Sequence, residues 1–416
     1  MNEWWDLWAQ WLRPSAGLPT VQWSLLLACA ALVGHLLQRY SGLPKIVGYS
    51  LVGTLAGWAG FGGVLWPLQG MGLFLLEFGV SLVLFDAGGR IALRWFRHNP
   101  MVLVQSLLEA ALSALLVYQL LLWLGQSVPV AAALAVVAMA ASPTVLTRVV
   151  HECHAGGPVT ERAITLSTLS TLYALALATA GAAWVRRPDA SALDALAAVL
   201  VVLGVSIASA LTLAVLLRAA LRLMSPGSES GALFLLSLVA ALSALAAHLG
   251  GSAPLAALLA GMIVKHRWPR PWAWQRQLGP VLSLVTMLMF VLVSCVAAQA
   301  PWSMAVATLV LALLGARLLA KACGVGLGHI GSGTSARQAL WLGAAMTPLS
   351  AVALLIASQL VLALPESGPA LAAIALPAIL LMELVGAVLV TWALYRAGEG
   401  IWPWGRTQRQ TKGNAP

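Results

Sequence analysis

Two segments of the sequence place a hydroxyl side chain beside a proline in the middle of an apolar run. They read Ala-Ala-Ser-Pro-Thr at 140–144 and Ala-Met-Thr-Pro-Leu at 345–349. Proline removes a backbone hydrogen bond and clashes with the preceding turn, so we expect a helix to break at each. The freed half-helix ends carry partial charges that can hold an ion or a small solute. The predicted binding residues in these two segments are Ser142, Pro143, Thr144, Thr347, Pro348 and Ser350.

Ionisable residues within apolar runs form a second group of candidates. A charge inside a bilayer is costly, and it marks a functional site by default. A carboxylate can bind a cation and a proton in turn, whereas the hydroxyls of Ser167, Ser170 and Thr171 offer oxygen ligands that do not titrate. Those hydroxyls can instead bond the carbonyl one turn back, and Asp86 and Glu109 can instead pair with nearby basic groups. The candidate proton-carrying carboxylates are Glu77, Asp86, Glu109 and Glu383, and the basic candidates are Arg317 and Lys321.

The composition indicates which kind of protein must position these groups. Of the 416 residues, 61% are hydrophobic and only 9% are charged, and the mean hydropathy is +0.91. Soluble domains are about half apolar and about a quarter charged, so a cytosolic enzyme, a disulfide scaffold and a disordered chain are excluded. The sequence contains no Walker motif, no nucleophile–base constellation and no metal-ligand spacing. We therefore expect no enzyme, no cofactor, no metal and no nucleic-acid partner.

Apolar runs of membrane-spanning length fill most of the chain. They are uninterrupted, unlike the alternating segments of a membrane barrel, so they predict an all-α polytopic membrane protein. Before the first run, the tryptophan-rich residues 1–20 are predicted to form an interfacial segment. Thirteen spans are predicted at 21–40, 44–63, 70–88, 100–125, 128–150, 161–185, 190–223, 229–250, 252–266, 278–299, 301–325, 337–361 and 367–396.

The basic residues are distributed unevenly between the two sides that these spans define. Of the 23 Lys and Arg residues, 18 fall on one side, which contributes to the net charge of +10. The positive-inside rule places that side in the cytoplasm. We therefore expect the N-terminus outside, the C-terminus and a short tail at 398–416 in the cytoplasm, and a bacterial-type inner membrane as the location.

The two proline-containing spans belong to an internal repeat. Pro44 lies 99 residues before Pro143, and Pro254 lies 94 residues before Pro348. Both upstream prolines open a span shortly after a glycine. These opening spans are the second and the ninth, seven apart, and an odd separation inverts the second half relative to the first. Matched broken helices in inverted halves predict the binding site of a secondary transporter.

Four segments of the sequence carry a recognisable pattern. They are Leu-Pro-Lys-Ile-Val-Gly-Tyr at 43–49 with Gly53 and Gly57, Glu-Phe-Gly-Val at 77–80 with Leu84, Phe85 and Gly88, Ser-Ala-Pro-Leu-Ala-Ala-Leu-Leu-Ala-Gly at 252–261, and residues 343–355. These segments resemble motifs of the cation/proton antiporters, the branch that contains sodium/proton and potassium-efflux exchangers, and the likeness extends over nearly the whole chain.

The resemblance implies a homodimer of thirteen-helix protomers with two crossing broken helices. It implies a transporter domain over 21–397, divided into a panel (21–88 and 229–299), a linker span (190–223) and a mobile core (100–185 and 301–396). The family's basic residue in the eleventh span corresponds to Lys321. The family's sixth span carries an ion-binding aspartate, and this position falls on Ser170-Thr171; the acidic position of the late broken helix becomes Leu349.

These departures leave Arg317 and Lys321 without the expected acidic partner. Three interpretations remain open. Another carboxylate can replace the aspartate; or the site can take an anion or organic acid; or the chain can act as a membrane partner protein without transport. We expect the first, exchange of Na⁺ or K⁺ for protons across the lipid bilayer.

Overall fold

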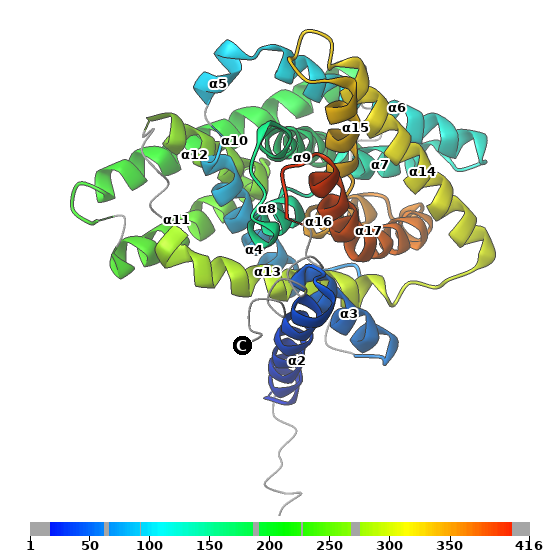
Figure 1. Ribbon diagram of the computed structural model, residues 1–416, viewed down its shortest axis with the longest axis horizontal. Helices are drawn as coiled ribbons and strands as arrows, with labels where there is room; N and C mark the ends of the chain where they lie inside the picture. Colours follow the sequence, from blue (N-terminus) through cyan, green and yellow to red (C-terminus); the bar gives the residue numbers. More distant parts are fainter. Residues whose placement is uncertain are drawn as a thin grey trace, which may run out of the picture.

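In the computed structural model, the described residues are 17–61, 66–91, 93–185, 191–225, 228–267 and 275–401. Every regular element within them is a helix, in agreement with the predicted all-α class (Figure 1). The helices are α2 (Gly17–Ser41), α3 (Lys45–Trp58), α4 (Gly70–Gly89), α5 (Leu93–His98), α6 (Met101–Trp123), α7 (Val128–Met139), α8 (Pro143–Cys153), α9 (Pro158–Val185), α10 (Ala192–Ala220), α11 (Glu229–His248), α12 (Ala253–Arg267), α13 (Gln275–Ala297), α14 (Met304–Leu327), α15 (Ala336–Ala345), α16 (Ala351–Ala363) and α17 (Gly368–Arg396).

Each predicted span is helical over most of its length. Ten segments in the described part of the chain are long and apolar enough to cross a membrane; thirteen crossings remain a prediction. The helix α2 begins at Gly17, and its candidate membrane-spanning part begins at Val21, next to the predicted boundary of the interfacial segment. Residues 1–16 and 402–416 lie outside the described residues. The short helix α5 was not predicted, because six residues carry too little periodicity.

The helices pair in a pattern that reflects the inverted repeat. If each helix of the first half is matched with the one seven spans later, α3 corresponds to α12, α4 to α13 and α6 to α14. The structure packs α4 against α12 and α3 against α13, and these two pairs exchange under that correspondence. The pair of α6 and α14 maps onto itself. The packing therefore has the approximate two-fold relation expected of inverted halves.

Small residues allow these pairs to approach closely, as is usual in membrane bundles. A Cβ atom added to Gly53 of α3 would lie 2.6 Å from the Val291 carbonyl oxygen of α13. Gly88 of α4 and Gly261 of α12 likewise face each other's helix backbone. The glycine spacing in the predicted spans is therefore a packing feature.

Both proline-containing spans are interrupted. The first helix stops at Met139 and resumes as α8 at Pro143, and the second stops at Ala345 and resumes as α16 at Ala351. Proline is favourable at the start of α8, where its missing N–H would be unpaired anyway. The breaks lie within one or two residues of their predicted positions, so the discontinuous helices are confirmed.

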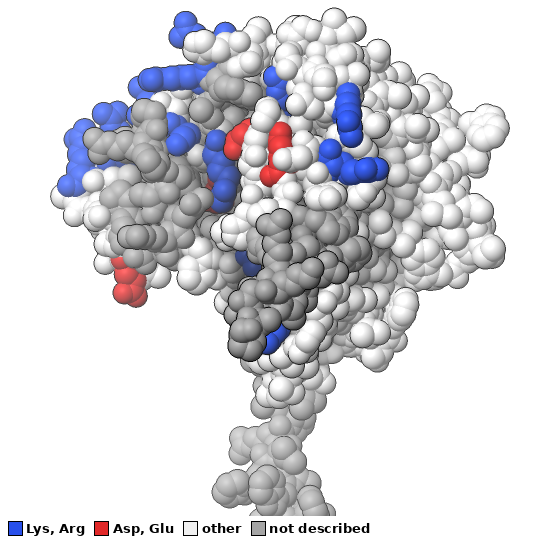
Figure 2. Space-filling model, viewed as in Figure 1, with Lys and Arg blue, Asp and Glu red and all other residues white. Residues whose placement is uncertain are grey.

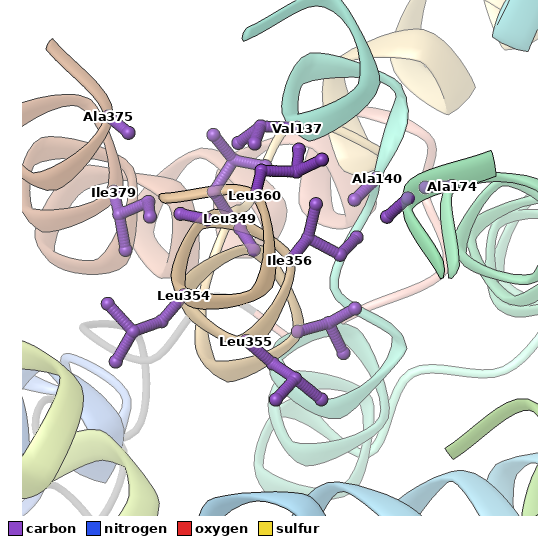
Figure 3. Close-up of a cluster of buried hydrophobic side chains, with 14 of the residues drawn as sticks. Val137, Ala140, Ala174, Leu349, Leu354, Leu355, Ile356, Leu360, Ala375 and Ile379 are labelled. Atoms are coloured by element: carbon purple, nitrogen blue, oxygen red, sulfur yellow. The ribbon is translucent and has the colours of Figure 1, made fainter. Parts of the chain in front are cut away.

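Apolar side chains enclose α16 on several sides. Figure 3 shows Val137 and Ala140 from the first broken span, Ala174 from α9, and Ile379 from α17 arranged around this half-helix. Leu354 and Ile356 on α16 are fully buried among them. A helix that is apolar all round belongs in the interior of a bundle, and α8, α9 and α16 lie in the middle of the ribbon in Figure 1.

The visible surface separates charged from apolar regions. In Figure 2, Lys and Arg side chains gather over the upper and left parts of the face, whereas its right flank, over α6 and α14 in Figure 1, is almost free of charge. Exposed leucines of α6 and α14 include Leu107, Leu115 and Leu319. Such a flank is suited to contact with lipid.

Candidate functional site

The two interrupted helices touch at their unwound segments. The Ser142 N–H donates to the Pro348 carbonyl oxygen at 3.0 Å, and the hydroxyls of Ser142 and Ser350 lie 2.7 Å apart. Ser142 also caps α8, because its Oγ accepts from the Val145 N–H. From α9, the Thr171 hydroxyl donates to the Ala141 carbonyl oxygen at 2.5 Å. The sequence-predicted residues of both breaks therefore converge on one buried crossing.

Arg317 of α14 neutralises the carboxyl ends of the first halves of both broken helices. Its Nε donates to the Ala138 carbonyl oxygen at 2.9 Å, and its Nη2 donates to that of Ala140 at 2.6 Å. Its Nη1 donates to the Thr347 carbonyl oxygen. A helix carboxyl terminus carries about half a negative charge, so one guanidinium balances about two of them. This fully buried arginine thus holds the crossing together.

One turn further along α14, Lys321 forms a buried ion pair with Glu109 of α6. Both side chains are fully buried. The Lys321 ammonium also donates to the Met139 carbonyl oxygen at 3.3 Å. Hydroxyls from two further positions donate to the Glu109 carboxylate, namely Ser113 at 3.2 Å and Ser170 of α9. A carboxylate, an ammonium and two hydroxyls therefore meet directly beside the crossing.

A glycine seam places Glu109 opposite Lys321. A Cβ added to Gly324 of α14 would collide with the Glu109 backbone, and one added to Gly328 would lie 2.8 Å from the Gln105 Cα. The Gln105 side-chain amide donates to the Val325 carbonyl oxygen at 2.9 Å. Close approach of the two helices is therefore what allows a lysine and a glutamate on different helices to meet.

A cavity of about 230 Å³ leads toward the crossing between α4, α8 and α13. Thr144, two residues beyond Ser142, lies on its wall with Thr286 of α13. Arg148 of α8 donates from Nη1 to the Ser283 hydroxyl of α13 at 3.1 Å. Hydroxyl and charged groups line much of the cavity, so it can admit water and ions. Its lining residues are Val83, Asp86, Arg90, Thr144, Thr147, Arg148, His151, Gly279, Leu282, Ser283 and Thr286.

Three of the four candidate carboxylates do not join this cluster. Asp86 pairs with Arg90 at 2.9 Å, at the end of α4. Glu77 of α4 accepts from the Gln359 amide of α16 at 3.4 Å. Glu383 of α17 accepts from the Ser294 hydroxyl of α13 at 2.8 Å. Only Glu109 contacts the basic residues near the crossing.

The hydroxyl stripe on α9 has both of the roles considered for it. Ser167, Ser170 and Thr171 each donate to a carbonyl in the preceding turn, at 2.8 to 3.0 Å. Only Ser170 and Thr171 also reach another helix, toward Glu109 and Ala141 respectively. The Ser167 hydroxyl therefore bonds the backbone of its own helix.

Lys321 has an acidic partner, and this partner is one of the carboxylates named as candidates to replace the missing aspartate. Glu109 occupies that role from α6, a different helix from the one that carries the aspartate in the resembling family. Ser113 and the carbonyl groups that bind Arg317 were not among the predicted site residues. The spacing of Gly324 and Gly328, matched to Gln105 and Glu109, is the signal that could have indicated the pairing.

The arrangement can bind a small cation or a proton. The Glu109 carboxylate and the two hydroxyls beside it are hard oxygen ligands, which suit a monovalent cation better than a soft metal. The ammonium of Lys321 already neutralises the carboxylate, so an incoming cation or proton must compete with it. This chemistry is ion exchange and includes no bond making or breaking in a substrate.

Comparisons with known proteins agree with this architecture. The family model described as "Sodium/hydrogen exchanger, transmembrane" matches residues 25–396. Two solved structures of the sodium proton antiporter MjNhaP1 from Methanocaldococcus jannaschii are similar in fold, each at 16% sequence identity. The structure at pH 8 gives a TM-score of 0.71 and covers 92% of this chain and 98% of that chain. The electron-microscopy structure gives 0.74, with 92% and 97% covered. No match is found among curated proteins.

Proposed function

Because the chain belongs to the sodium/hydrogen exchanger family of membrane transporters, we propose that it exchanges a monovalent cation for protons at Glu109. Members of this family are transporters and not enzymes. The observation that carries the proposal is the contact of Glu109 with both Lys321 and Ser170. Ser170 belongs to the pair Ser170-Thr171, on which the position of the ion-binding aspartate of the resembling family falls. The Glu109 carboxylate of α6 thus lies beside the position on α9 where the family's aspartate is missing from this chain.

Competition for one carboxylate supplies the coupling. In the conformation described here, Lys321 neutralises Glu109. A cation that enters between Glu109, Ser113 and Ser170 displaces the ammonium, and a proton bound by Glu109 does the same. The carboxylate cannot hold both at full strength, so the ion that is bound on one side is exchanged for the other kind on the opposite side. This exclusion is the physical requirement of an antiporter.

We place Na⁺ before K⁺ as the transported cation. The structurally similar MjNhaP1 is described as a sodium proton antiporter, and the Glu109 site lies among closely packed helices. Close packing leaves less room around the carboxylate, which suits the smaller of the two cations. Parallel measurements with Na⁺ and K⁺ distinguish the two.

The other two interpretations have less support. An anion carrier needs a cationic group that is free to bind the anion, yet Arg317 donates to three carbonyl oxygens and Lys321 to Glu109. A membrane partner protein without transport has no need of a polar cavity that reaches Thr144, next to the crossing of the broken helices. Both observations favour cation exchange.

The family resemblance also extends the proposal to the larger architecture. We assign α2–α4 and α11–α13 to a panel, and α6–α9 and α14–α17 to a core that moves against it, with α10 as the linker. We further propose a homodimer in a bacterial-type inner membrane, with the C-terminus in the cytoplasm. The uneven distribution of Lys and Arg supports this orientation.

Purified protein in liposomes tests the exchange directly. A trapped pH-sensitive dye reports whether external Na⁺ or K⁺ dissipates an imposed pH gradient, with choline as the inactive cation. We expect the wild type to respond to Na⁺ and Glu109→Gln to lose at least about tenfold in rate, equivalent to about 1.4 kcal/mol. Glu366→Gln, an exposed carboxylate between α16 and α17, is the matched control and should exchange normally.

The possible outcomes separate the three interpretations. Wild-type exchange in a Glu109→Gln protein would overturn the assignment of Glu109. Uptake of an anion without cation dependence, lost in Lys321→Ala, would favour the anion carrier. Absence of ion flux at every pH from about 6 to 9 would favour the partner protein.

A further inference from the structure

Glu383 is a buried acid that the exchange at Glu109 does not use. It lies in the middle of α17 and is fully buried. Its Oε2 accepts from the Ser294 hydroxyl at 2.8 Å. Among the described residues, its Oε1 has no hydrogen-bond partner. A buried polar atom without a partner costs about 1–3 kcal/mol and calls for an explanation.

The surroundings of Glu383 favour its neutral form. Glu109 faces an ammonium, whereas in the described part of the chain the hydrogen bond that Glu383 forms is with the uncharged hydroxyl of Ser294. An ionised carboxylate without a partner is strongly disfavoured in such a place. A protonated carboxyl group there still accepts the bond from Ser294. The ligand that suits the site is therefore a proton.

The charged groups on the helices around α17 do not alter this conclusion. These helices are α3, α7, α8, α13, α14, α15 and α16. Arg317 and Lys321 on α14 bind the crossing and Glu109, and Arg148 binds Glu152 and Ser283. The ionisable residues of these helices, some of which lie near helix ends, are Lys45, Tyr49, Arg148, His151, Glu152, Cys153, Arg276, Cys295, Arg317, Lys321, Cys323 and Arg337.

Metal cations fit this position poorly. Hard cations take several oxygen ligands, and the hydroxyl of Ser294 is the single side-chain oxygen that contacts Glu383 within the described residues. The cavity between α4, α8 and α13 does not include Glu383 in its lining. It does include Thr286, eight residues before Ser294 on α13, about 12 Å away along a helix. Protons entering by that cavity thus have a short distance to cover.

Glu383 also lies between the crossing and α13. A Cβ added to Gly386, one turn later on α17, would lie 3.0 Å from the Pro348 Cα in the unwound segment. On its other side, Ser294 and Val291 are the residues of α13 against which Gly53 of α3 packs. The carboxyl group therefore connects the helix that touches the crossing to the α3–α13 pair. A movement of the crossing along α13 would change the surroundings of this acid.

We propose that Glu383 is a second proton-carrying site, separate from Glu109, which binds a proton and no metal cation and raises the number of protons exchanged for each cation. This inference rests on the proposed function, because it adds a proton to the exchange at Glu109. Glu109 alone exchanges one proton for one cation. With Glu383, two protons move against one cation, and each cycle carries net charge.

The ratio of protons to cations tests this assignment in liposomes. At a fixed cation gradient and membrane potential, the pH gradient at which net flux stops gives the ratio. We expect about two protons per cation for the wild type and about one for Glu383→Gln, which keeps an acceptor for Ser294. Glu366→Gln, which removes an exposed carboxylate between α16 and α17, should keep the wild-type ratio.

Infrared spectroscopy provides a readout that does not depend on transport. A protonated buried carboxyl group gives a carbonyl-stretch band that shifts in D₂O. We expect such a band in the wild type at neutral pH, lost in Glu383→Gln and retained in Glu109→Gln. A wild type without this band, or an unchanged ratio in Glu383→Gln, would overturn the assignment. If the wild type transports nothing, the exchange at Glu109 fails, while the band still decides whether Glu383 holds a proton.

Discussion

Lys321 and Glu109 form an ion pair between α14 and α6 in which neither side chain has any exposed surface. Removal of one partner leaves a buried charge without compensation, which costs about 3–5 kcal/mol, whereas replacement of both by uncharged groups is often tolerated. We therefore expect Lys321→Met to unfold at a clearly lower temperature in detergent. The double variant Glu109→Gln with Lys321→Met should recover most of this loss of stability. Additive losses in the double variant would contradict a direct pair.

The seam between α6 and α14 should be sensitive to a single methyl group. A Cβ at Gly324 collides with the Glu109 backbone, so Gly324→Ala must push the helices apart. Overpacking typically costs about 1–3 kcal/mol. The control is Gly326→Ala on the same helix, where an added Cβ meets no atom; it should be neutral or stabilising by up to about 1 kcal/mol. Equal melting temperatures for the two variants would refute the seam.

The carboxylate at the crossing should be movable from α6 back to α9. The Ser170 hydroxyl already contacts the Glu109 carboxylate, so an aspartate at 170 lies within reach of Lys321. In liposomes, Glu109→Gln combined with Ser170→Asp should regain a substantial part of the exchange that Glu109→Gln alone loses. Thr171→Asp in the same background is the control. Its carboxylate would face the Ala141 carbonyl oxygen, so we expect no recovery of exchange in this variant. Equal recovery in both variants would show that exchange does not depend on which of the two positions carries the carboxylate.

Glu399 should stabilise the start of α9. Its carboxylate accepts from the N–H groups of Val159 and Thr160 at 2.8 and 2.7 Å, and from the Thr160 hydroxyl. A carboxylate that satisfies the free N–H groups of a helix N-terminus contributes about 0.5–2 kcal/mol. We expect Glu399→Ala to lower the melting temperature and Glu366→Ala, at an exposed loop position, to leave it unchanged. Because the contact is with α9, faster amide hydrogen exchange at Val159 and Thr160 would localise the effect.

The sequence was sufficient for the parts of the fold that depend on local chemistry. Proline geometry acts within a few residues, so Pro143 and Pro348 indicated where both spans break. The position of Glu109 could not be predicted in the same way, because its contact with Lys321 joins residues 212 apart. That contact depends on how closely α6 and α14 approach, which in turn depends on Gly324. Arg317 was recognised as a candidate, but its partners are backbone carbonyls, which no residue type reveals.

The two-fold relation between the halves predicts which helices separate when the protein opens on the side of the membrane opposite the cavity. Under that relation α4 and α13 exchange places, and α8 becomes α16. The image of the open cavity between α4, α8 and α13 is therefore a closed seam between α13, α16 and α4, and there the Glu77 carboxylate meets the Gln359 amide. If the halves trade conformations, that contact separates and the seam opens on the side of the membrane opposite the cavity. A cysteine at position 359, in a variant without native cysteines, should then react with an impermeant thiol reagent added on that side only while exchange proceeds.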